Sequence, residues 1–224
     1  MNPAGLAESA DLPTHERVYR TIRTRILTGE MAPGDSVTLR GLAEALGVSM
    51  TPAREAVRRL VAERALEMTA SGRAAIPTPN MARLEELFRA RELLEPELAF
   101  RALPHTNKST ISTLRAIDGT IDGFLAIGDA AGYVRANTTF HSTLYRLANA
   151  PALMALVESV WLQTAPIMRR IYGRLGTAAL TDYHEAALAA LACRDAVALA
   201  EAIHQDVEQG AALLRQAALD ECIL

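Results

Sequence analysis

The sequence predicts a mainly α fold, with a winged helix-turn-helix at the N-terminus and an all-helical antiparallel bundle after it. Half of the 224 residues are apolar and only 4% are aromatic, so a substantial core of mostly aliphatic side chains can form. Two short segments with helical periodicity flank a glycine turn at Gly47. From Met81 onward, longer helical segments follow one another with short breaks, which is typical of a helical bundle.

The first two helices are predicted by periodicity and by their end signals. Apolar residues recur with helical spacing between Val18 and Leu27, which indicates a helix over residues 15–28. Thr38 suits the N-cap of a short helix that ends at Leu46. Gly47 then fits a left-handed C-terminal cap, so the chain turns sharply before the third helix.

The third helix starts with residues that favour a helix N-terminus. Ser49 or Thr51 can cap it, Pro52 is tolerated in its first turn, and Glu55 suits a capping box. We expect this helix to run to about Arg64.

A β-hairpin and a linker are expected next. The stretch "ALEMTASGRAAIPTP" predicts two short strands around a turn at Ser71 and Gly72. A proline-bounded linker follows near residues 77–80. These boundaries divide the chain into a winged helix-turn-helix over residues 1–78 and a helical domain over residues 79–224.

Six helices joined by short turns are predicted in the second domain. Pro96 lies inside the first of them, and we expect a kink there. The helices are expected over residues 81–103, 107–127, 130–149, 151–173, 178–192 and 195–219.

Charge and composition restrict the partners and the compartment. The net charge is −3, but residues 1–80 carry ten Arg and nine acids while residues 81–224 carry thirteen basic and seventeen acidic residues. Contact with a polyanion is therefore expected only in the first part. No apolar run long enough to span a membrane and no signal peptide is found. Cys193 and Cys222 lack metal or disulfide spacing, which favours reduced thiols in the cytoplasm.

The third helix is the candidate DNA-reading element. Its first-turn N–H groups, with Ser49 and Thr51, can hold phosphate at the positive end of the helix dipole. Arg54 lies one turn further along and can reach a guanine edge in the major groove. The alternative is that Arg54, Arg58 and Arg59 form the solvated face of a protein-interaction module.

The order of these pieces adds a family resemblance. "PGDSVTLRGLAEALGVSMTPAREAVRRLVAE", followed by a hairpin with "SGRAAIP", resembles the winged helix of the GntR family of bacterial transcription regulators over about residues 15–77. Met50 stands where this family commonly has Arg, and Glu63-Arg64 replaces the usual Glu-Gly. Loss of a guanine reader should relax or change one operator position by roughly 1–3 kcal/mol. The resemblance implies DNA-contacting roles for Arg40, Ser49, Met50, Thr51, Arg54 and Gly72.

Three histidines and one asparagine form a second candidate site. Asn137 and His141 are four residues apart and share a helix face. His184 and His204 each lie ten residues from Arg194, so a symmetric helical hairpin would place them at the same height. Converging imidazoles suit a divalent transition metal such as Zn, Ni or Mn. The alternative for each histidine alone is a hydrogen-bonded core or surface residue.

This second region also resembles a known module. "RARELLEPELAFRA", "NTTFH" and "YHEAALAALACRDAVALAEAIH" look like landmarks of the FCD ligand-binding domain of FadR-type GntR regulators, in its six-helix, VanR-like version. The resemblance implies one metal ion per chain, held by a carboxylate and three His, with a small organic acid completing its coordination. Asn137 replaces the usual Asp, which would weaken or retune the site.

Arg91 has two candidate roles. It matches the Arg of the family's R-x-x-LE motif and could clamp a carboxylate with two parallel donors. It could equally form an i,i+4 ion pair with Glu95 on the helix surface.

The sequence thus predicts a ligand-responsive DNA-binding regulator. The resemblance further implies a homodimer that represses from a short palindromic operator and is released by a small carboxylate effector. One rival hypothesis is a constitutive DNA binder with a structural metal. The other is a metal-dependent enzyme, in which three His activate water.

Overall fold

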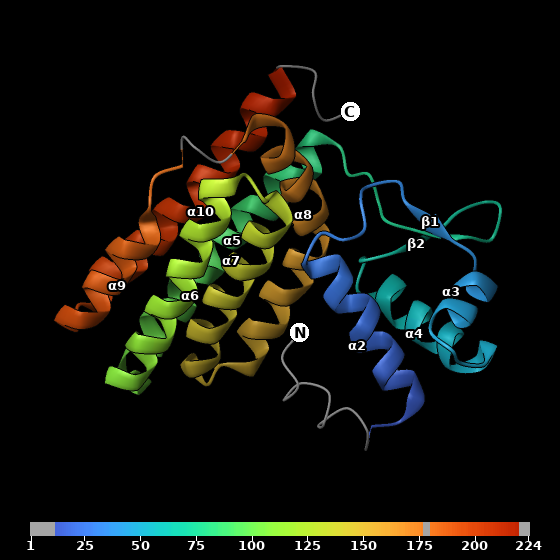
Figure 1. Cartoon of the computed structure of the whole chain (residues 1–224), viewed down its shortest axis with the longest axis horizontal. Helices are drawn as coiled ribbons and strands as arrows, with labels where there is room; N and C mark the ends of the chain where they lie inside the picture. The colour runs from blue at the N-terminus through green and yellow to red at the C-terminus, as the bar shows by residue number, and fades with distance from the viewer. Residues whose placement is uncertain (1–11, 177–179, 220–224) are drawn as a thin grey trace.

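A computed structural model describes residues 12–176 and 180–219 of the chain. It places a small α/β unit beside a larger bundle of helices, as predicted (Figure 1). The change from one architecture to the other falls between strand β3, Ala74–Ala75, and helix α5, Met81–Ala102. No helix in the described part of the chain is long and apolar enough to cross a membrane.

The N-terminal unit is a helix-turn-helix with a small sheet. The three strands are antiparallel in the order β1-β3-β2, with Ser36 opposite Ala75 and Met68 opposite Ala74. The apolar faces of α2 and α4 meet in a core that includes Ile22, Ile26 and Leu60. Its elements are α2 Thr14–Leu27, β1 Ser36–Val37, α3 Leu39–Ala45, α4 Met50–Ala62, β2 Glu67–Met68 and β3 Ala74–Ala75.

The turn between α3 and α4 follows the predicted chemistry with one difference. The Thr38 hydroxyl accepts a hydrogen bond from the Gly41 N–H at 3.0 Å, and Gly47 adopts the left-handed φ of 63°. Ser49 is the N-cap residue of α4, but its side chain makes no capping hydrogen bond. The hydroxyl of Ser49 is therefore available to a partner outside the helix.

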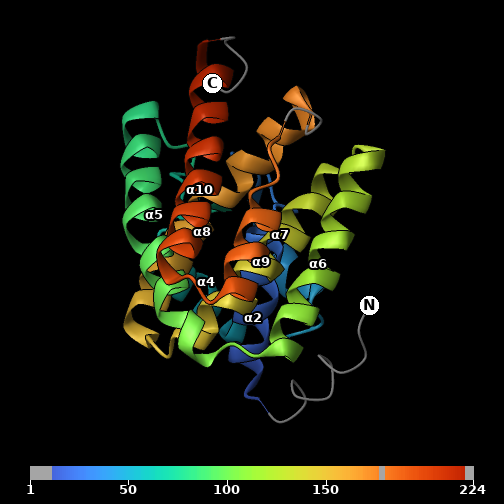
Figure 2. The same cartoon turned by 90° about the vertical axis from the view of Figure 1, so that its left-hand side faces the viewer.

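Helices α5 to α10 form the bundle, which lies in front of α2 and α4 in Figure 2. The buried side chains of its core are mostly aliphatic. α5 packs against α10 and α8, α6 packs against α7, and α9 packs against α10. Short 3-10 turns, Leu103–His105 and Arg146–Ala148, follow α5 and α7. The remaining helices are α6 Lys108–Ile127, α7 Ala130–Tyr145, α8 Pro151–Leu175, α9 Tyr183–Cys193 and α10 Ala196–Leu219.

The structure differs from the expected elements in a few places. Strand β1 was not expected, because two residues are too few to give an alternating pattern. α9 starts at Tyr183 and not near residue 178. Asp182 caps this start by accepting a hydrogen bond from the Glu185 N–H at 3.0 Å. α5 contains Pro96, as expected, and the kink there stays a prediction. Cys193 is an exposed free thiol, and Cys222 lies outside the described residues.

Candidate functional site: a His and Asp cluster in the bundle and the recognition helix

Two imidazoles and one carboxylate meet inside the bundle. His141 lies on α7, His184 in the first turn of α9, and Asp206 on α10. The two Nε2 atoms are 3.4 Å apart, and Asp206 lies 3.1 Å from Nε2 of His141 and 3.9 Å from Nε2 of His184. Three different helices thus bring their donor atoms to one point.

The other ring nitrogen of each histidine faces outward to a fixed partner. Nδ1 of His141 is 3.0 Å from the Tyr145 hydroxyl, which donates its proton to Glu95 at 3.0 Å. The hydroxyl can therefore only accept from His141, which places a proton on Nδ1. Nδ1 of His184 faces the buried carboxylate of Asp118 at 3.3 Å. Both rings consequently direct Nε2 to the centre of the cluster, as metal-binding histidines do.

The charges of the cluster favour a proton or a cation at its centre. Burial would raise the pKa of Asp206, but the hydrogen bond and charge of His141, with His184 and Arg91, lower this pKa to about 2. Burial would lower the pKa of His184, but hydrogen bonding to Asp118 and the charges of nearby carboxylates raise it. Asp206 is therefore ionised at neutral pH and attracts positive charge between the two rings.

The donor set fits a divalent transition metal. Bonds of about 2.0–2.1 Å in a tetrahedral site put ligand atoms about 3.3 Å apart, close to the separations of 3.1–3.9 Å found here. Oδ1 of Asn137 is buried without a hydrogen-bond partner, one helical turn before His141, and Asn137 lines the same pocket. An orphaned amide oxygen beside two imidazoles and a carboxylate is an available fourth ligand.

His204 does not join this cluster. Within residues 12–176 and 180–219, it belongs to no group of three His, Cys, Asp or Glu ligand atoms lying within 4.8 Å of one another. Its buried Nδ1 has no hydrogen-bond partner. Two residues along a helix turn the side chain by about 200°, so His204 and Asp206 point to nearly opposite sides of α10. The hairpin is not symmetric about Arg194, and Asp206 takes the place expected for His204.

Arg91 forms the predicted i,i+4 ion pair with Glu95, but inside the protein and not on the helix surface, while its role as a carboxylate clamp stays a prediction. Its Nε donates to Glu95 at 2.6 Å, and its side chain is only 11% exposed. Burial would lower the pKa of Arg91, but the charge of Glu95 outweighs burial and raises it. Arg91 also lines the pocket that contains His141 and Asp206. The ion pair therefore orients the guanidinium toward the cluster.

The pocket is small, with one polar end and one apolar wall. Its cavity volume is about 50 Å³. His141, Asp206, Asn137 and Arg91 supply the polar end. The apolar wall is built from aromatic and aliphatic side chains, among them Tyr133, Trp161, Met168 and Tyr172.

The predicted DNA-contacting residues gather at the exposed end of the N-terminal unit. Ser49, Met50, Thr51 and Arg54 are all exposed in the first turns of α4, while Ala53 belongs to its buried face. Because Ala53 faces the core, the first-turn N–H groups and these four exposed side chains share one open surface.

Two further predicted residues flank this surface. Arg40 is exposed on α3 and pairs with Glu44 at 2.9 Å, a solvent-exposed pair that is easily exchanged for a phosphate. Gly72 has a φ of 75° at the tip of the hairpin, which forms the wing.

The fold defines a class of protein: a winged-helix transcription regulator with a second, all-helical domain. Residues 14–75 match the family "Bacterial regulatory proteins, gntR family", and residues 86–209 match the FCD domain. The chain belongs to the GntR family and is a FadR-type regulator with an FCD domain. The gntR family consists of bacterial regulatory proteins, and the chain's relatives are transcription regulators, so the chain is a transcription regulator and not an enzyme.

Curated relatives and solved structures agree with this assignment. The chain is 26% identical to the HTH-type transcriptional regulator McbR of Escherichia coli K12, over 89% of this chain and 92% of McbR. It is 22% identical to the gluconate operon transcriptional repressor of Bacillus subtilis, over 87% and 82% of the two chains. The structure titled E. coli McbR/YncC matches with a TM-score of 0.86 at 25% identity, over 92% of this chain and 99% of that one.

Proposed function

We propose that this protein is an operator-binding repressor whose DNA affinity is set by a small organic acid bound at a divalent-metal site in the helical domain. The observation that carries the proposal is the meeting of His141, His184 and Asp206 beside the guanidinium of Arg91. The metal is Zn, Ni or Mn, one ion per chain. The repressor acts as a homodimer on a palindromic operator in the cytoplasm.

The donor set retains the charge that the family resemblance implies. The usual set has one carboxylate and three histidines, and here the single carboxylate is Asp206 on α10 instead of an Asp at position 137. Two imidazoles and one carboxylate form the cluster, and Asn137, whose buried Oδ1 has no hydrogen-bond partner, would add a neutral oxygen. Compared with the donor set that the resemblance implies, the negative charge thus comes from α10 and not from α7, and its size is unchanged.

The pocket suits a small acid with a short apolar body. When bound, the metal supplies a Lewis-acidic contact for one oxygen of the effector carboxylate. Arg91 is placed to donate to a second oxygen, and the aromatic wall contacts the carbon skeleton. A cavity of about 50 Å³ limits the effector to a few non-hydrogen atoms unless the pocket widens.

The recognition helix supplies both position and sequence reading. First-turn N–H groups of α4, with Ser49 and Thr51, are expected to hold phosphate. Met50 and Arg54 are expected to face base edges. Arg40 and the wing at Gly72 contact the backbone on either side.

The first experiment is elemental analysis of the purified, tag-free protein beside three variants. We expect about one transition-metal ion per chain in the wild type and in His204→Ala, and strong loss in His184→Ala and Asp206→Ala. His204→Ala is the matched control, because it removes an imidazole from the same helix as Asp206. Metal loss in His204→Ala with retention in Asp206→Ala would contradict the assigned ligand set.

The second experiment measures release from DNA. An operator selected from a random DNA pool is titrated with a panel of small carboxylates in a gel-shift assay. A repressor with a sensing site loses affinity for the operator with one of these acids. If none changes DNA affinity and metal removal unfolds the bundle, the metal is structural and the protein binds DNA constitutively.

Met50→Arg tests how the recognition helix reads DNA. Because a guanidinium can bond to two acceptors of guanine, the variant should select a different or stricter half-site, by roughly 1–3 kcal/mol at one position. Selection from the random pool measures this preference. Identical selected sequences for both proteins would show that position 50 does not face a base.

A further inference from the structure

Helix α8 forms a wall that the two domains share. It lies between the bundle and α2 (Figure 1). Trp161, Thr164, Ala165 and Met168 line the ligand pocket, with the 3-1-3 spacing of a single helix face. The same stretch of helix contacts the N-terminal unit through its other side. Glu158 and Trp161 lie in the same segment of α8, before the internal Pro166, so a shift of this segment caused at the pocket face also moves the face toward the N-terminal unit.

Apolar packing fixes α8 to the N-terminal unit. Leu162 is 1% exposed and belongs to the apolar core formed by α2, α4 and the sheet. The turn after α2 approaches α8 so closely that a Cβ on Gly29 would lie 2.7 Å from the side chain of Arg169. The N-terminal unit and α8 are thus in direct contact along several turns of the helix.

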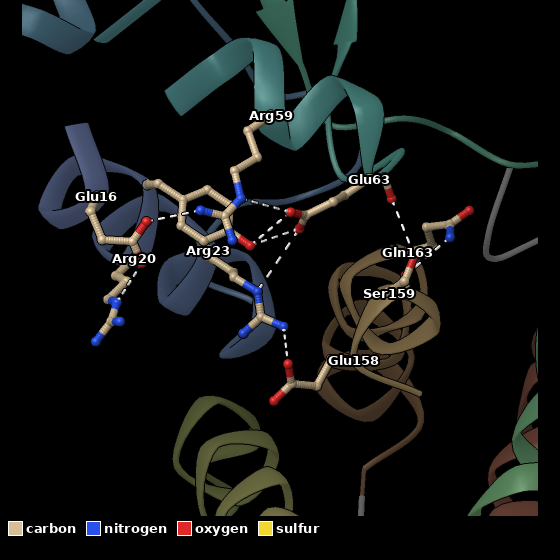
Figure 3. Close-up of polar contacts among 9 residues, drawn as sticks. Glu16, Arg20, Arg23, Arg59, Glu63, Glu158, Ser159 and Gln163 are labelled. Atoms are coloured by element: carbon tan, nitrogen blue, oxygen red, sulfur yellow. Dashed lines mark hydrogen bonds and ion pairs between the residues drawn. The ribbon is translucent and has the colours of Figure 1, made fainter. Parts of the chain in front are cut away.

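A polar joint lies beside this packing and leads to the recognition helix (Figure 3). Glu63, the C-cap residue of α4, accepts from the Tyr19 hydroxyl at 2.8 Å and from Nε of Arg59 at 3.3 Å. Arg23 on α2 lies between two carboxylates, 4.0 Å from Glu63 and 2.7 Å from Glu158 on α8. Arg23 therefore connects α8 to the end of α4.

The surroundings of this joint strengthen it. The side chains of Arg23, Glu63 and Glu158 are only 18%, 26% and 25% exposed, so solvent screens their charges incompletely. The Ser159 hydroxyl also lies 3.5 Å from the Glu63 carbonyl oxygen. Movement of Glu158 changes the position that Arg23 can hold between the two carboxylates.

The pocket side of α8 responds to the proposed effector contact. Nε1 of Trp161 donates to Glu95 at 2.8 Å, and Glu95 also accepts from Arg91. A ligand that draws Arg91 toward its own carboxylate alters the group to which Trp161 is bound. Trp161 lies one turn from Glu158 on the same helix.

We propose that α8 couples the ligand pocket to the recognition helix, and that the Arg23 bridge between Glu158 and Glu63 is the joint. This inference rests on the proposed ligand-sensing function and adds its route. A change at Trp161 moves α8, Glu158 moves with it, and Arg23 passes the displacement to Glu63 at the end of α4.

Hydrogen exchange of the full-length protein, read by mass spectrometry, tests the route without a known effector or operator. Zn²⁺ is the first probe, added to chelator-treated protein. In the wild type we expect slower exchange in peptides of α7, α9 and α10, and also in α4, by at least about fivefold, the low end for coupled sites. In Arg23→Gln and in Glu158→Gln, protection of α7, α9 and α10 by Zn²⁺ remains and the response of α4 is lost.

Two matched control variants each remove an ion pair that lies outside the joint. Arg25→Gln removes the exposed pair with Glu30 from the same helix as Arg23, and Glu97→Gln removes the exposed pair with Arg101. Both should respond to Zn²⁺ as the wild type does. If Arg23→Gln and Glu158→Gln also transmit normally to α4, the joint is excluded.

A second experiment tests the α8 route without relying on metal binding. Trp161→Phe keeps the ring in the pocket and removes the donor to Glu95, so it perturbs α8 without an ion. We expect altered exchange in α4 for Trp161→Phe, and no such change when Arg23→Gln is also present. A wild type that takes up no Zn²⁺ would overturn the proposed metal site, while this pair of variants would still decide the route. Unchanged exchange in α4 for Trp161→Phe alone would overturn the route itself.

Discussion

Glu95 shows how a charged side chain can be held at 0% exposure inside the bundle. It accepts hydrogen bonds from Arg91 at 2.6 Å, Trp161 at 2.8 Å and Tyr145 at 3.0 Å. These donors replace the water that burial removes, and the guanidinium balances the charge. Through Tyr145, the same carboxylate also fixes the ring of His141. One buried residue thus positions both Arg91, the proposed anion clamp, and a candidate metal ligand.

Glu95→Gln should destabilise the protein by roughly 3 kcal/mol, because the buried charge of Arg91 loses its partner. Urea unfolding followed by circular dichroism measures the loss. Glu97→Gln, in an exposed pair on the same helix, should cost less than about 1 kcal/mol. Equal losses in the two variants would show that Arg91 is not held by Glu95.

Tyr172, a partly buried residue of the pocket wall, predicts a loss of stability at alkaline pH. Burial and the charge of Asp206 raise the pKa of Tyr172 to about 12, against about 10 in the unfolded chain. Because the folded pKa is the higher one, unfolded chains lose the proton first, and stability falls as the pH rises from about 10 to 12. Tyr172→Phe should flatten this decline in urea unfolding at several pH values. If the variant loses stability with pH as steeply as the wild type, ionisation of Tyr172 is not the cause.

The residue-level prediction from sequence succeeded where chemistry and helix spacing agreed. The sequence predicted that His141 and His184 meet, and the structure places their Nε2 atoms 3.4 Å apart. It missed Asp206, because a hairpin symmetric about Arg194 places His204 at the height of His184. The available signal was position: Asp206 lies on the buried stripe of α10, three residues after Ile203 and four before Gly210.

At the scale of single elements, periodicity and end signals predicted most of the helices. Long amphipathic segments leave a clear pattern, so α5, α6 and α10 lie within a few residues of their expected ranges. Short strands and the exact ends of helices depend on hydrogen bonds that periodicity does not reveal. Strand β1 exists because Ser36 and Val37 pair with β3, and the start of α9 depends on its Asp182 cap.

The end of the recognition helix contains a residue that is strained by its conformation. Arg64 has a φ of 58°, in the left-handed region that favours glycine. Hydrogen bonds from Arg64 to the Val61 carbonyl at 3.0 Å and from Ala65 to the Leu60 carbonyl at 2.9 Å form a Schellman cap. The family resemblance implies glycine here, and the geometry explains that preference.

Arg64→Gly should therefore stabilise the protein by about 1 kcal/mol, since it removes the left-handed penalty. Arg58→Gly, at an exposed position inside the same helix, should instead destabilise by about 1 kcal/mol. Thermal unfolding of the two variants beside the wild type gives the comparison. Destabilisation by both glycines would mean that the Arg64 side chain contributes more than its backbone strain costs.

At the scale of the whole molecule, the two domains share more than a linker. Leu27 packs against the cores of both, and Leu162 of α8 lies in the N-terminal core. The sequence predicted each domain but not this arrangement. The contacts between Arg23 and Glu158 join residues 135 positions apart, and nothing in local patterning specifies such a pair.

Metal binding should stabilise the entire chain and not the bundle alone. A ligand present at 100 times its dissociation constant adds about 2.7 kcal/mol to folding. Because α8 belongs to both cores, calorimetry should give one unfolding transition that shifts upward with Zn²⁺. Two separate transitions, of which only one moves, would show that the domains unfold independently.

Trp161 is the only tryptophan in the chain, and it stands in the wall of the ligand pocket. Its indole donates to a carboxylate, and its ring faces Tyr145 with centroids 5.9 Å apart. The intrinsic fluorescence of the protein therefore originates from a single place. Any acid or ion that enters the pocket should change the emission, which makes the unlabelled protein its own optical sensor for identifying the compound it recognises.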